Sequence, residues 1–563
     1  MLQKKGIFDI ILSGKYNSVI FFILLLLLSL LTAFSYGTDY FIGDDNFFHI
    51  ARFETLMLSL REGTFPSYID YDSFSNYGYL VKPFYPDFIL IPFAALGNIT
   101  SPSFAYTFLL FTMSVLCGVF MYNFVRKVYG SSFVAAVASL LYTFSLYRLL
   151  DVYHRAALGE ALSFTFVPIV FLGLYYIIAG DYKKWYVIAI GFSLMIMTHL
   201  LSSFLLFITV GVFLLIYHKR LLKEPKRIYY LIVAGAVSLV LVSYFIYPFL
   251  EQLISDKFYF QKFKMSPYKT GQSSLEISAI FEGMVGGFGF KHVRYQLGAL
   301  LILPLFLRLF IGKDHKAQLL KHTDNLVIIG IVLILLMSAL APWESRPLAY
   351  LSIIQFPWRL QEFISFFFSI AAAYYLYLFI KTKRYRAVAM LILILLTSIV
   401  ITIDGRHFAA QDPGVRASPS PLQKNGLEVM GMEYVPADTP SAHILVEERG
   451  DSIISLHKNT SVTNFKRDAG ITRFDVSITG NDELELPLFY YKGYNAKLDG
   501  ENISVNRSDL GLIKIPVTHS GTVEVRYTGT IIQKVSFYIT IISFLLLFLY
   551  IWFRNRRLKD ISN

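Results

Sequence analysis

The chain has very little cysteine and little charge, and both shortages narrow the class of protein to which it can belong. Its single cysteine, Cys117, lies in an apolar run, so neither an internal disulfide nor a cysteine metal site is available. Charged residues make up 16% of the 563 residues, whereas 55% are hydrophobic and 17% are aromatic. Soluble domains contain roughly 25% charged residues. The sequence therefore predicts an integral membrane protein.

Apolar segments long enough to cross a bilayer recur along the chain. The first, residues 18–33, carries no charge. A signal peptide cleaved near Ser35 is the alternative, but the length of the run and the many further segments favour a retained span. The stretch 185–217 is too long for one crossing, and we split it at His199. We expect twelve spans in all, the others covering 103–125, 132–149, 161–179, 229–250, 296–311, 325–341, 359–380, 387–404 and 532–553.

Basic residues gather in the predicted loops and indicate an orientation. Cytoplasmic loops of membrane proteins are enriched in Lys and Arg, so the net charge of +12 does not require a nucleic-acid partner. This scheme requires the proline-bounded stretch 83–96 not to cross the membrane fully. With twelve spans and an inner N-terminus, six basic clusters fall on the cytoplasmic side: 126–127, 183–184, 218–227, 308–321, 381–386 and 554–557.

The hydrophilic block near the C-terminus has the pattern of β-structure. Hydrophobic and polar residues alternate over 471–478, 512–517 and 522–527, with turn signals between them, which suggests a β-sandwich. On the same topology this block lies outside the cell. We therefore expect three parts: a transmembrane domain over 1–404 with a first outer loop at 36–102, an extracytoplasmic β-rich domain over 405–530, and a final span with a basic tail over 531–563.

Charged residues follow the first span directly. If a helix begins after Gly43, Asp45, His49 and Arg52 lie within about 60° of one another on one face, and Asp44 is the N-cap. Such a face offers a base, an imidazole and a cation. The structural alternative is that Asp45 pairs with His49 while Arg52 extends to lipid headgroups.

A second polar cluster lies between the spans at 132–149 and 161–179. Arg148, Asp151 and Arg155 share a helical face, so a salt bridge between Asp151 and Arg155 is one interpretation. His154 adds to the positive charge, and Glu160 lies beyond a glycine. The local cations then exceed the acids, and a phosphate-bearing ligand would balance them.

A third cluster precedes the span at 359–380. Pro357 suits the first turn of a helix, which places Arg359 beside unpaired amides at the positive end of the helix dipole. Arg359 is thus a candidate anion site, although a tryptophan–arginine anchor at the membrane interface is the alternative. His199 stands alone between two apolar runs, where a histidine more often belongs to the core than to a binding site.

The order of these motifs resembles a known family. The motifs are Gly43-Asp44-Asp45-x-x-x-His49-x-x-Arg52, His154-Arg-Ala-Ala-Leu-Gly-Glu160 leading to Pro168, Thr198-His199-Leu200 and Gln355-Phe-Pro-Trp-Arg359. They resemble bacterial membrane proteins labelled "6-pyruvoyl-tetrahydropterin synthase-related", whose architecture is similar to YfhO-like and other GT-C glycosyltransferases. The pterin chemistry of that label has no support, because no three-histidine zinc site is visible. Residues 490–500, 510–515 and 521–527 also look like the β-domain of YfhO-like proteins.

The resemblance implies an enzyme of the bacterial cytoplasmic membrane whose active site faces outside. It would move a sugar from a polyprenyl-phosphate carrier to a cell-envelope acceptor, with teichoic acid, capsule, glycolipid and protein all open. Asp44 or Asp45 would deprotonate the acceptor or hold Mg²⁺ or Mn²⁺. The metal itself stays unknown, and the Asp70-Tyr-Asp72 pattern is too short to identify it. The resemblance also implies that the following residues bind the substrates: His49, Arg52, His154, Arg155, Glu160, His199, Gln355 and Arg359.

Two other functions use the same features. A lipid or glycolipid flippase or transporter would also need charged groups facing a cavity, but it would more often show internal repeats. A non-catalytic assembly protein for envelope polysaccharide would use the outer β-domain alone. The tyrosine-rich stretch 68–85 could stack on sugar rings, and an interfacial aromatic belt is the simpler interpretation.

Overall fold

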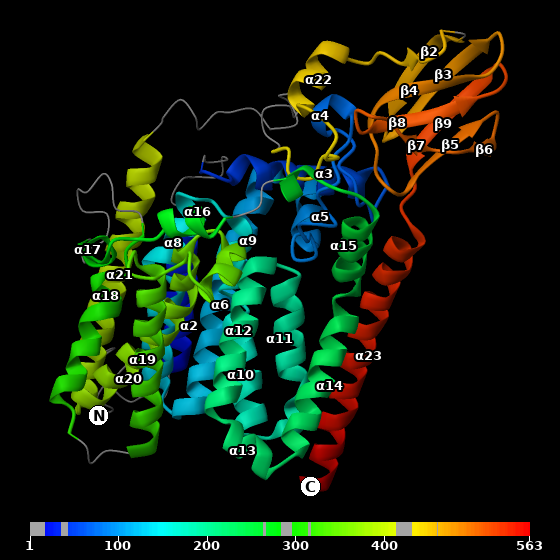
Figure 1. The fold of residues 1–563 in the computed structure, drawn as a ribbon. Coiled ribbons are helices and arrows are strands. Elements are labelled where there is room, and N and C mark those ends of the chain that lie inside the picture. The colour runs from blue at the N-terminus through cyan, green and yellow to red at the C-terminus, as the bar shows by residue number, and fades with distance from the viewer. Residues whose placement is uncertain are drawn as a thin grey trace, which may run out of the picture. The chain divides into compact units, whose positions relative to one another are not determined.

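The apolar segments of the sequence form helices, and the hydrophilic C-terminal block forms a pair of sheets. The computed structural model describes residues 17–34, 43–262, 266–282, 295–312, 317–411, 431–458 and 460–562. The chain divides into two compact units, whose helices and strands are labelled in Figure 1. The helical unit comprises Met1–Asn46, Ser103–Gly235 and Met265–Ser418, and the mixed unit comprises Phe47–Pro102, Ala236–Lys264 and Pro419–Asn563.

Helices of very different length build the helical unit. Several begin at a residue suited to that position: Ser131 Oγ accepts from Val134 N, and Pro168 lies in the first turn of its helix. The helices are α2 (Asn17–Phe34), α6 (Pro102–Tyr129), α7 (Ser132–Thr143), α8 (Leu146–Tyr153), α9 (Leu158–Ser163), α10 (Val167–Ile178), η1 (Tyr182–Lys184), α11 (Tyr186–Ile196), α12 (Leu200–Ile216), α13 (His218–Lys223), α16 (Pro267–Gln272), α17 (Ile277–Glu282), α18 (Ala299–Ile302), η3 (Leu303–Phe310), α19 (Ala317–Met337), η4 (Leu348–Ile354), η5 (Pro357–Leu360), α20 (Gln361–Phe379) and α21 (Lys383–Gln411). Helix α14 (Lys226–Leu241) continues from this unit into the mixed unit.

In the part of the chain that the structure describes, fewer helices are long enough to cross a membrane than the twelve that the sequence predicts. Within the described residues, seven helices are long and apolar enough to cross a membrane, or eight if α14 and α15 (Ser243–Ser255), which are bent by 72°, form one span. Shorter apolar helices cover Ser18–Phe34, Leu200–Ile216 and Ala299–Phe310. The fold is therefore that of a mostly helical chain with several long apolar helices, as membrane proteins have, and twelve crossings stay a prediction.

Two local predictions about where helices begin and end are confirmed. The stretch 185–217 is interrupted where expected, because α11 ends at Ile196 and α12 begins at Leu200. In the stretch 83–96, a helix begins only at Ile91: α5 (Ile91–Ile99) has nine residues. Such a helix rises about 14 Å, roughly half of a bilayer core of about 30 Å. It is too short to cross alone.

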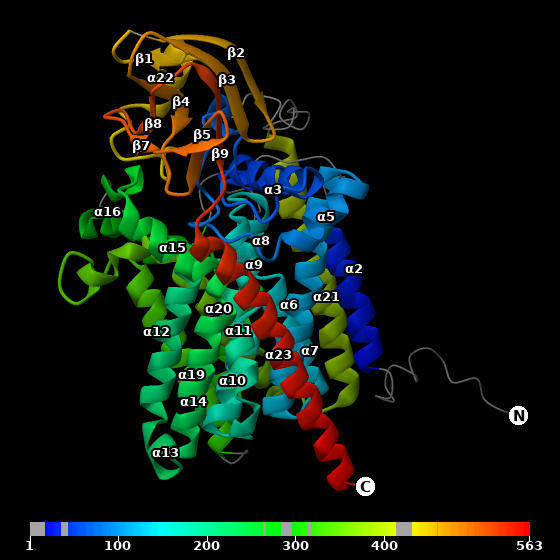
Figure 2. The same ribbon diagram turned by 90° about the vertical axis from the view of Figure 1, so that its right-hand side faces the viewer.

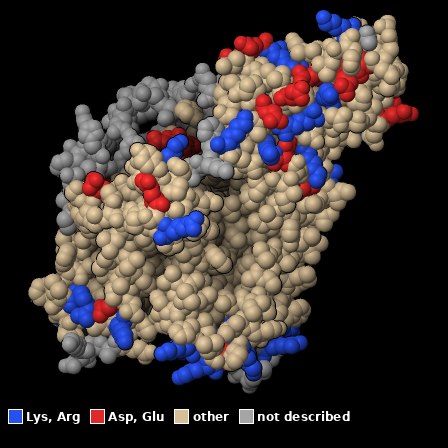
Figure 3. Space-filling view, viewed as in Figure 1, with Lys and Arg blue, Asp and Glu red and all other residues tan. Residues whose placement is uncertain are grey.

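Basic loops meet at one end of the helical unit. Tyr129, at the end of α6, hydrogen-bonds through its hydroxyl to Thr323 Oγ1 near the start of α19 at 3.0 Å. Tyr217, after α12, contacts His322 Nδ1 at 2.8 Å, and Arg227 Nη1 donates to the carbonyl of Ile177 in α10 at 2.7 Å. Figure 3 shows Lys and Arg side chains gathered around α13, at this end. The predicted topology with twelve spans requires the basic loops to lie on one side of the membrane, and this arrangement agrees with it.

The mixed unit combines helices with two antiparallel sheets. Its helices are α3 (Asn46–Arg61), α4 (Ser73–Asn76), α5, α15, η2 (Tyr259–Lys262), α22 (Ala442–Arg449) and α23 (Ile531–Ser562). Its strands are β1 (Ile454–Ser455), β2 (Thr460–Asp468), β3 (Ile471–Ile478), β4 (Asp482–Phe489), β5 (Tyr494–Leu498), β6 (Glu501–Ile503), β7 (Asn506–Arg507), β8 (Leu512–Val517) and β9 (Gly521–Tyr527).

The predicted strands are confirmed, since 471–478, 512–517 and 522–527 lie in β3, β8 and β9. The strand orders are β1-β4-β8-β7 and β2-β3-β9-β5-β6 (Figure 2). Both sheets contribute to one buried cluster that includes Phe474 of β3, Leu484 of β4 and Ile515 of β8, as a β-sandwich does. Asp499 and Gly500 both have positive φ and connect β5 to β6, as the two-residue turn of a hairpin requires.

Two tyrosines of the stretch 68–85 belong to a second core of the mixed unit. Tyr77 and Tyr79 have no exposed surface, and they lie in one cluster with Phe489, Tyr491 and Val435. Buried rings cannot stack on a sugar or form a membrane belt, so both interpretations of the stretch 68–85 are wrong for these tyrosines. The loop instead folds together with the C-terminal residues.

Candidate functional site

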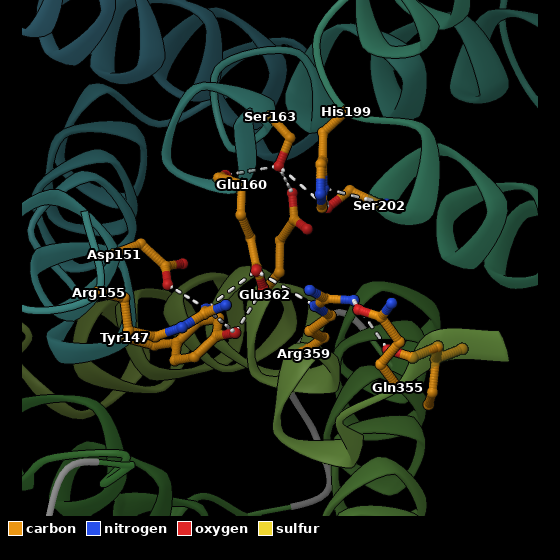
Figure 4. A network of polar contacts seen from close by, with 11 residues as sticks. Tyr147, Asp151, Arg155, Glu160, Ser163, His199, Ser202, Gln355, Arg359 and Glu362 are labelled. Atoms are coloured by element: carbon orange, nitrogen blue, oxygen red, sulfur yellow. Dashed lines mark hydrogen bonds and ion pairs between the residues drawn. The ribbon is translucent and has the colours of Figure 1, made fainter. Parts of the chain in front are cut away.

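One glutamate in the helical unit contacts two arginines that lie far apart in the sequence. Glu160 of α9 accepts a hydrogen bond at Oε2 from Arg155 Nη1 at 2.9 Å. The same oxygen lies 3.4 Å from Nε of Arg359 in η5. All three side chains are buried. Figure 4 shows the two guanidinium groups approaching Glu160 from opposite sides.

Residues of α8 complete the surroundings of Arg155. Asp151 Oδ1 accepts from Arg155 Nη1 at 2.5 Å, which confirms the predicted salt bridge. Tyr147 donates its hydroxyl to Glu160 Oε1 at 2.5 Å and accepts from Arg155 Nη1 at 3.2 Å. The chain reverses after Arg155 and brings Glu160 back to it. Glu160 thus joins Asp151 in neutralising Arg155, although it lies beyond a glycine in the sequence.

Two residues beside the arginines have left-handed backbone conformations. Ala156, which follows Arg155, has φ +49°, and Gln355, four residues before Arg359, has φ +67°. Residues other than glycine rarely adopt this region, and such strain tends to occur at functional sites. Gln355 accepts from Arg359 Nη1 through Oε1 at 3.0 Å. The strained backbone thus accompanies the positions of both guanidinium groups.

Arg359 lies at the start of a helix, as the sequence predicted. Helix η5 contains Pro357 in its first turn and leads directly into α20. Arg359 Nη1 also donates to the carbonyl of Ile354 at 2.9 Å. The side chain is thus held by Glu160, Gln355 and the preceding backbone, and these contacts fix the direction of the guanidinium.

Asp44 and Asp45 are held beside this network through their backbone. Asp45 N donates to the carbonyl of Arg155 at 2.8 Å, and Asp44 N donates to the carbonyl of His154 at 3.0 Å. A Cβ on Gly43 would come within 2.5 Å of Ala156 Cβ, so this close approach requires glycine. Both aspartates are exposed. Their carboxylates are therefore accessible at the edge of a buried ionic network.

The charges around Asp45 act in opposite directions. Partial desolvation raises the pKa of the Asp45 carboxyl above its ordinary value, Arg155 opposes this rise, and Asp44 adds to it. Burial lowers the pKa of Arg155, but Glu160 and Asp151 more than reverse this effect and hold its pKa above the ordinary value. Arg155 is therefore a permanent cation, whereas Asp45 is a carboxylate with increased affinity for a proton.

A chain of hydrogen bonds connects Glu362 to His199. Ser163 Oγ donates to Glu362 Oε1 at 2.6 Å and lies 3.3 Å from Ser202 Oγ. Ser202 Oγ in turn lies 2.8 Å from His199 Nδ1, which also caps α12 by accepting from Ser202 N. Because His199 caps a helix, its contacts agree with the interpretation that it is a histidine of the core and not part of a binding site.

Sequence reasoning missed several residues of this network. Tyr147, Ser163, Ser202 and Glu362 were not among the candidates. Glu362 had a usable signal, because it is a lone acid at the start of the apolar run of α20. The two serines had none, since serine is common in apolar helices and only the fold brings them together.

His49 and Arg52 do not share a helical face with Asp45, so this prediction is wrong. Helix α3 begins at Asn46, and Asp45 lies in the preceding turn. Asp44 lies one residue further from the helix, which excludes it as the N-cap. His49 and Arg52 instead belong to the mixed unit, where His49 Nδ1 contacts Arg52 Nη1 at 3.1 Å.

Arg52 is part of a closed structural pair. It forms a buried salt bridge with Asp87, and its Nη2 also donates to the carbonyls of Tyr85 and Pro86 at 3.2 and 3.1 Å. Its guanidinium lies over the Tyr85 ring, 4.1 Å from the centroid. These partners all belong to the protein itself, as is typical of an ion pair in a core. Arg52 therefore has a structural role.

The described residues contain no group of three or more His, Cys, Asp or Glu side chains placed to hold a metal ion. The Asp70-Tyr-Asp72 pattern does not form such a group. Asp70 is buried and pairs with Lys82 Nζ at 3.0 Å. Burial, followed by the charges of Glu62 and Asp70, raises the pKa of Asp72 to about 6.

Comparisons with known proteins assign no activity. No protein-family model matches the chain, and no solved structure matches it. The chain is similar to an uncharacterized protein of Lactococcus lactis subsp. cremoris (strain MG1363), with 24% identity over 355 residues, which are 59% of this chain and 55% of the relative. The chain thus spans about half the length of the curated relative that it matches. This identity establishes neither a family nor a function.

Proposed function

We propose that the protein is a GT-C-type membrane glycosyltransferase that moves a sugar from a polyprenyl-phosphate donor to a cell-envelope acceptor. The observation that carries the proposal is an accessible carboxylate, Asp45, beside two arginines that share Glu160. Glycosyl transfer from a lipid phosphate needs a base for the acceptor and positive charge for the departing phosphate. Asp45 offers the base, and the guanidinium groups of Arg155 and Arg359 offer the positive charge, part of which Glu160 and Asp151 neutralise.

Asp45 acts as the base. It accepts the proton of an acceptor hydroxyl while that oxygen attacks the anomeric carbon of the sugar, and the bond from this carbon to the phosphate oxygen breaks. The raised pKa of Asp45 suits this role, because a base works best when its pKa approaches the working pH. The products are the glycosylated acceptor and the free polyprenyl phosphate.

Arg155 and Arg359 stabilise the phosphate as it departs. A guanidinium carries five N–H donors, more than the contacts of Arg359 with Glu160, Gln355 and Ile354 use among the described residues. Fixed cations aimed at developing charge lower the barrier of such a step. Glu160 keeps the two guanidinium groups in place and limits their mutual repulsion.

The positions of the basic loops support an outward-facing site. Helix η5, which holds Arg359, leads into α20, and α20 runs from Glu362 in its first turn to the basic cluster 381–386 beyond its end. Helix α12 runs from His199 to the cluster 218–227. The ionic network and the basic loops therefore lie at opposite ends of these helices. If the basic end is cytoplasmic, Asp45 faces outside.

A transfer assay tests the proposal. The purified protein is incubated with a labelled polyprenyl-phosphate sugar and candidate envelope acceptors. Replacing the base should lower transfer by about 10²- to 10⁴-fold in Asp45→Asn. Asp181→Asn, an exposed aspartate at the basic end, is the matched control and should keep full activity. Transfer that persists in both Asp44→Asn and Asp45→Asn contradicts the catalytic role.

A lipid or glycolipid flippase is the second candidate. Glu160 and Glu362 lie within apolar helical segments, and buried acids in such segments are common in transporters. The same preparation distinguishes the two functions when it is reconstituted in vesicles. Movement of the labelled lipid to the other leaflet without transfer of its sugar favours the flippase.

A further inference from the structure

The mixed unit contains a cavity that the proposed reaction does not use. It has a volume of about 530 Å³ and lies between the outer-loop residues 63–71, the sheet that contains β3, β5 and β9, and the start of α23. Figure 2 shows β9 leading directly into α23, so the chain itself connects two walls. Pockets of roughly 300–1,000 Å³ are typical of sites for small ligands.

The lining of this cavity is rich in tyrosine and carries positive charge. Four tyrosines with accessible surface contribute to it, Tyr71, Tyr494, Tyr527 and Tyr538, and the buried Tyr68 supports them from behind. Arg526 and Lys534 supply two cations, and the lining contains neither Asp nor Glu. Tyrosine offers a flat apolar ring together with a hydroxyl, which suits the alternating apolar and hydroxyl faces of a sugar. The two cations attract carboxylate or phosphate groups.

Hydrogen bonds fix the walls of the cavity. Thr530 and Gln533 cap α23 reciprocally, since Gln533 N donates to Thr530 Oγ1 at 3.1 Å and Thr530 N donates to Gln533 Oε1 at 2.9 Å. Gln533 Nε2 also donates to the Tyr527 hydroxyl at 2.8 Å. The Tyr68 hydroxyl donates to the carbonyl of Gln533 at 2.8 Å. The binding surface is thus formed before any ligand arrives.

A close backbone approach also shapes the cavity. Gly470 has φ +74°, and a Cβ there would lie 3.1 Å from the Tyr71 ring. Tyr494 and Tyr527 meet edge to face, with their ring centroids 5.2 Å apart. The exposed Tyr538 has 61% of its surface accessible. The cavity therefore combines fixed inner rings with an accessible ring.

We infer that this cavity binds an anionic oligosaccharide, whose negative groups are carboxylates or phosphates. The idea that this oligosaccharide is the acceptor of the sugar rests on the proposed function. The idea that the cavity binds it does not. An anionic phospholipid headgroup shares the negative charge and would account for Lys534 and Tyr538 at the start of the apolar helix α23. It gives no reason for the rings of Tyr494 and Tyr527 on the sheet. The cavity favours the oligosaccharide because it pairs aromatic rings with cations.

Binding is measured on the full-length protein in detergent, in the Asp45→Asn background, so that loss of transfer does not affect the result. The probes are tetragalacturonic acid, maltotetraose phosphorylated at a terminal O6, and unmodified maltotetraose. At least one anionic probe should bind about tenfold more tightly than maltotetraose, because a charge-assisted hydrogen bond adds this much. A difference between the two anionic probes identifies the negative group.

Two variants locate the binding. Arg526→Gln and Tyr538→Ala should each weaken binding of the anionic probe about tenfold, and the fold should survive because both side chains are exposed. Lys514→Gln, on β8 in the other sheet and paired with Glu483 at 3.1 Å, is the matched charge control. It should bind as the parent does.

Three outcomes overturn the inference: neither anionic probe binds, maltotetraose binds as tightly as they do, or the two variants bind like the control. Vesicles of anionic phospholipid that compete fully with the probe assign the cavity to a headgroup instead. A protein that binds the probes but does not transfer sugar contradicts only the proposed function. A protein that transfers sugar without this binding contradicts only the inference.

Discussion

The helical unit and the mixed unit both bury charged side chains, but they arrange them differently. In the mixed unit, each buried cation has one carboxylate partner: Arg52 pairs with Asp87, and Lys82 pairs with Asp70. In the helical unit, Arg155 and Arg359 share Glu160. Further acids, which are Asp45, Asp151 and Glu362, lie around the same network.

This difference separates a structural ion pair from a candidate site. A buried pair in which one cation meets one carboxylate belongs to the fold. The network of the helical unit contains more acids than cations, and it has strained backbone at Ala156 and Gln355. Its aspartates at the edge are exposed. Positive φ values also occur in the mixed unit, at Phe74, Ser75 and Asn76 near Asp70. Shared charge together with exposed carboxylates therefore distinguishes the candidate site from the structural pairs.

The largest effect is expected for Arg52→Ala. Removing one partner of a buried pair leaves Asp87 unpaired in the core, which costs about 3–5 kcal/mol of the free energy of unfolding. Thermal unfolding of the purified protein in detergent measures it. If the comparison is correct, the double replacement Arg52→Met with Asp87→Leu recovers most of this loss, because an apolar pair of similar size is tolerated. A single variant as stable as the parent would show that the pair is not structural.

Local patterns in the sequence predicted the elements well. The alternation of 471–478 predicted β3, and the polar residues at 198–200 predicted the break between α11 and α12. In both cases the signal and the structure lie within the same few residues. Arg359 at the start of a helix was predicted for the same reason, because Pro357 specifies the first turn.

Contacts between distant residues were not predictable in this way. The partner of Arg52 is Asp87, 35 residues further along, and no periodicity connects them. The helical wheel also failed for Asp45, since it assumed that the helix began two residues earlier. Glu160 reaches Arg155 because the chain reverses at Ala156, and alanine is not a residue that signals a left-handed turn.

A smaller effect is expected for Gly43→Ala. The added Cβ would meet Ala156 Cβ at 2.5 Å and the His154 carbonyl at 2.9 Å, so the turn that holds Asp45 must shift. Overpacking of this kind costs about 1–3 kcal/mol, and transfer should fall with it. Gly211→Ala in α12 is the control, since a Cβ there meets nothing within 4 Å. It should be neutral or stabilise by about 0.5–1 kcal/mol. Equal effects of the two replacements would contradict the close approach.

The strain at Ala156 predicts a still smaller change. Alanine at φ +49° costs about 1–2 kcal/mol relative to glycine, which itself loses about 0.5–1 kcal/mol of chain entropy on folding. Ala156→Gly should therefore stabilise the protein by up to about 1 kcal/mol, while a looser turn lowers transfer. Ala157→Gly, at φ −77°, is the matched control and should only destabilise. Loss of stability in both variants would show that no strain is stored at Ala156.

The smallest effect concerns the stability of Asp45→Asn and its dependence on pH. The pKa of Asp45 is raised in the folded protein, so its folded carboxyl binds a proton more tightly than the unfolded one, whose pKa is about the ordinary 3.8. The stabilisation from this carboxyl is complete below pH 3.8 and is lost as the pH rises through the folded pKa. Asparagine does not ionise, so the Asp45→Asn variant does not lose stability in this way as the pH rises. Its melting temperature should exceed that of the parent slightly at pH 7, and the difference should shrink toward pH 4, whereas the proposed transfer should fall. A lower melting temperature at pH 7 would place Asp45 with the structural pairs of the mixed unit.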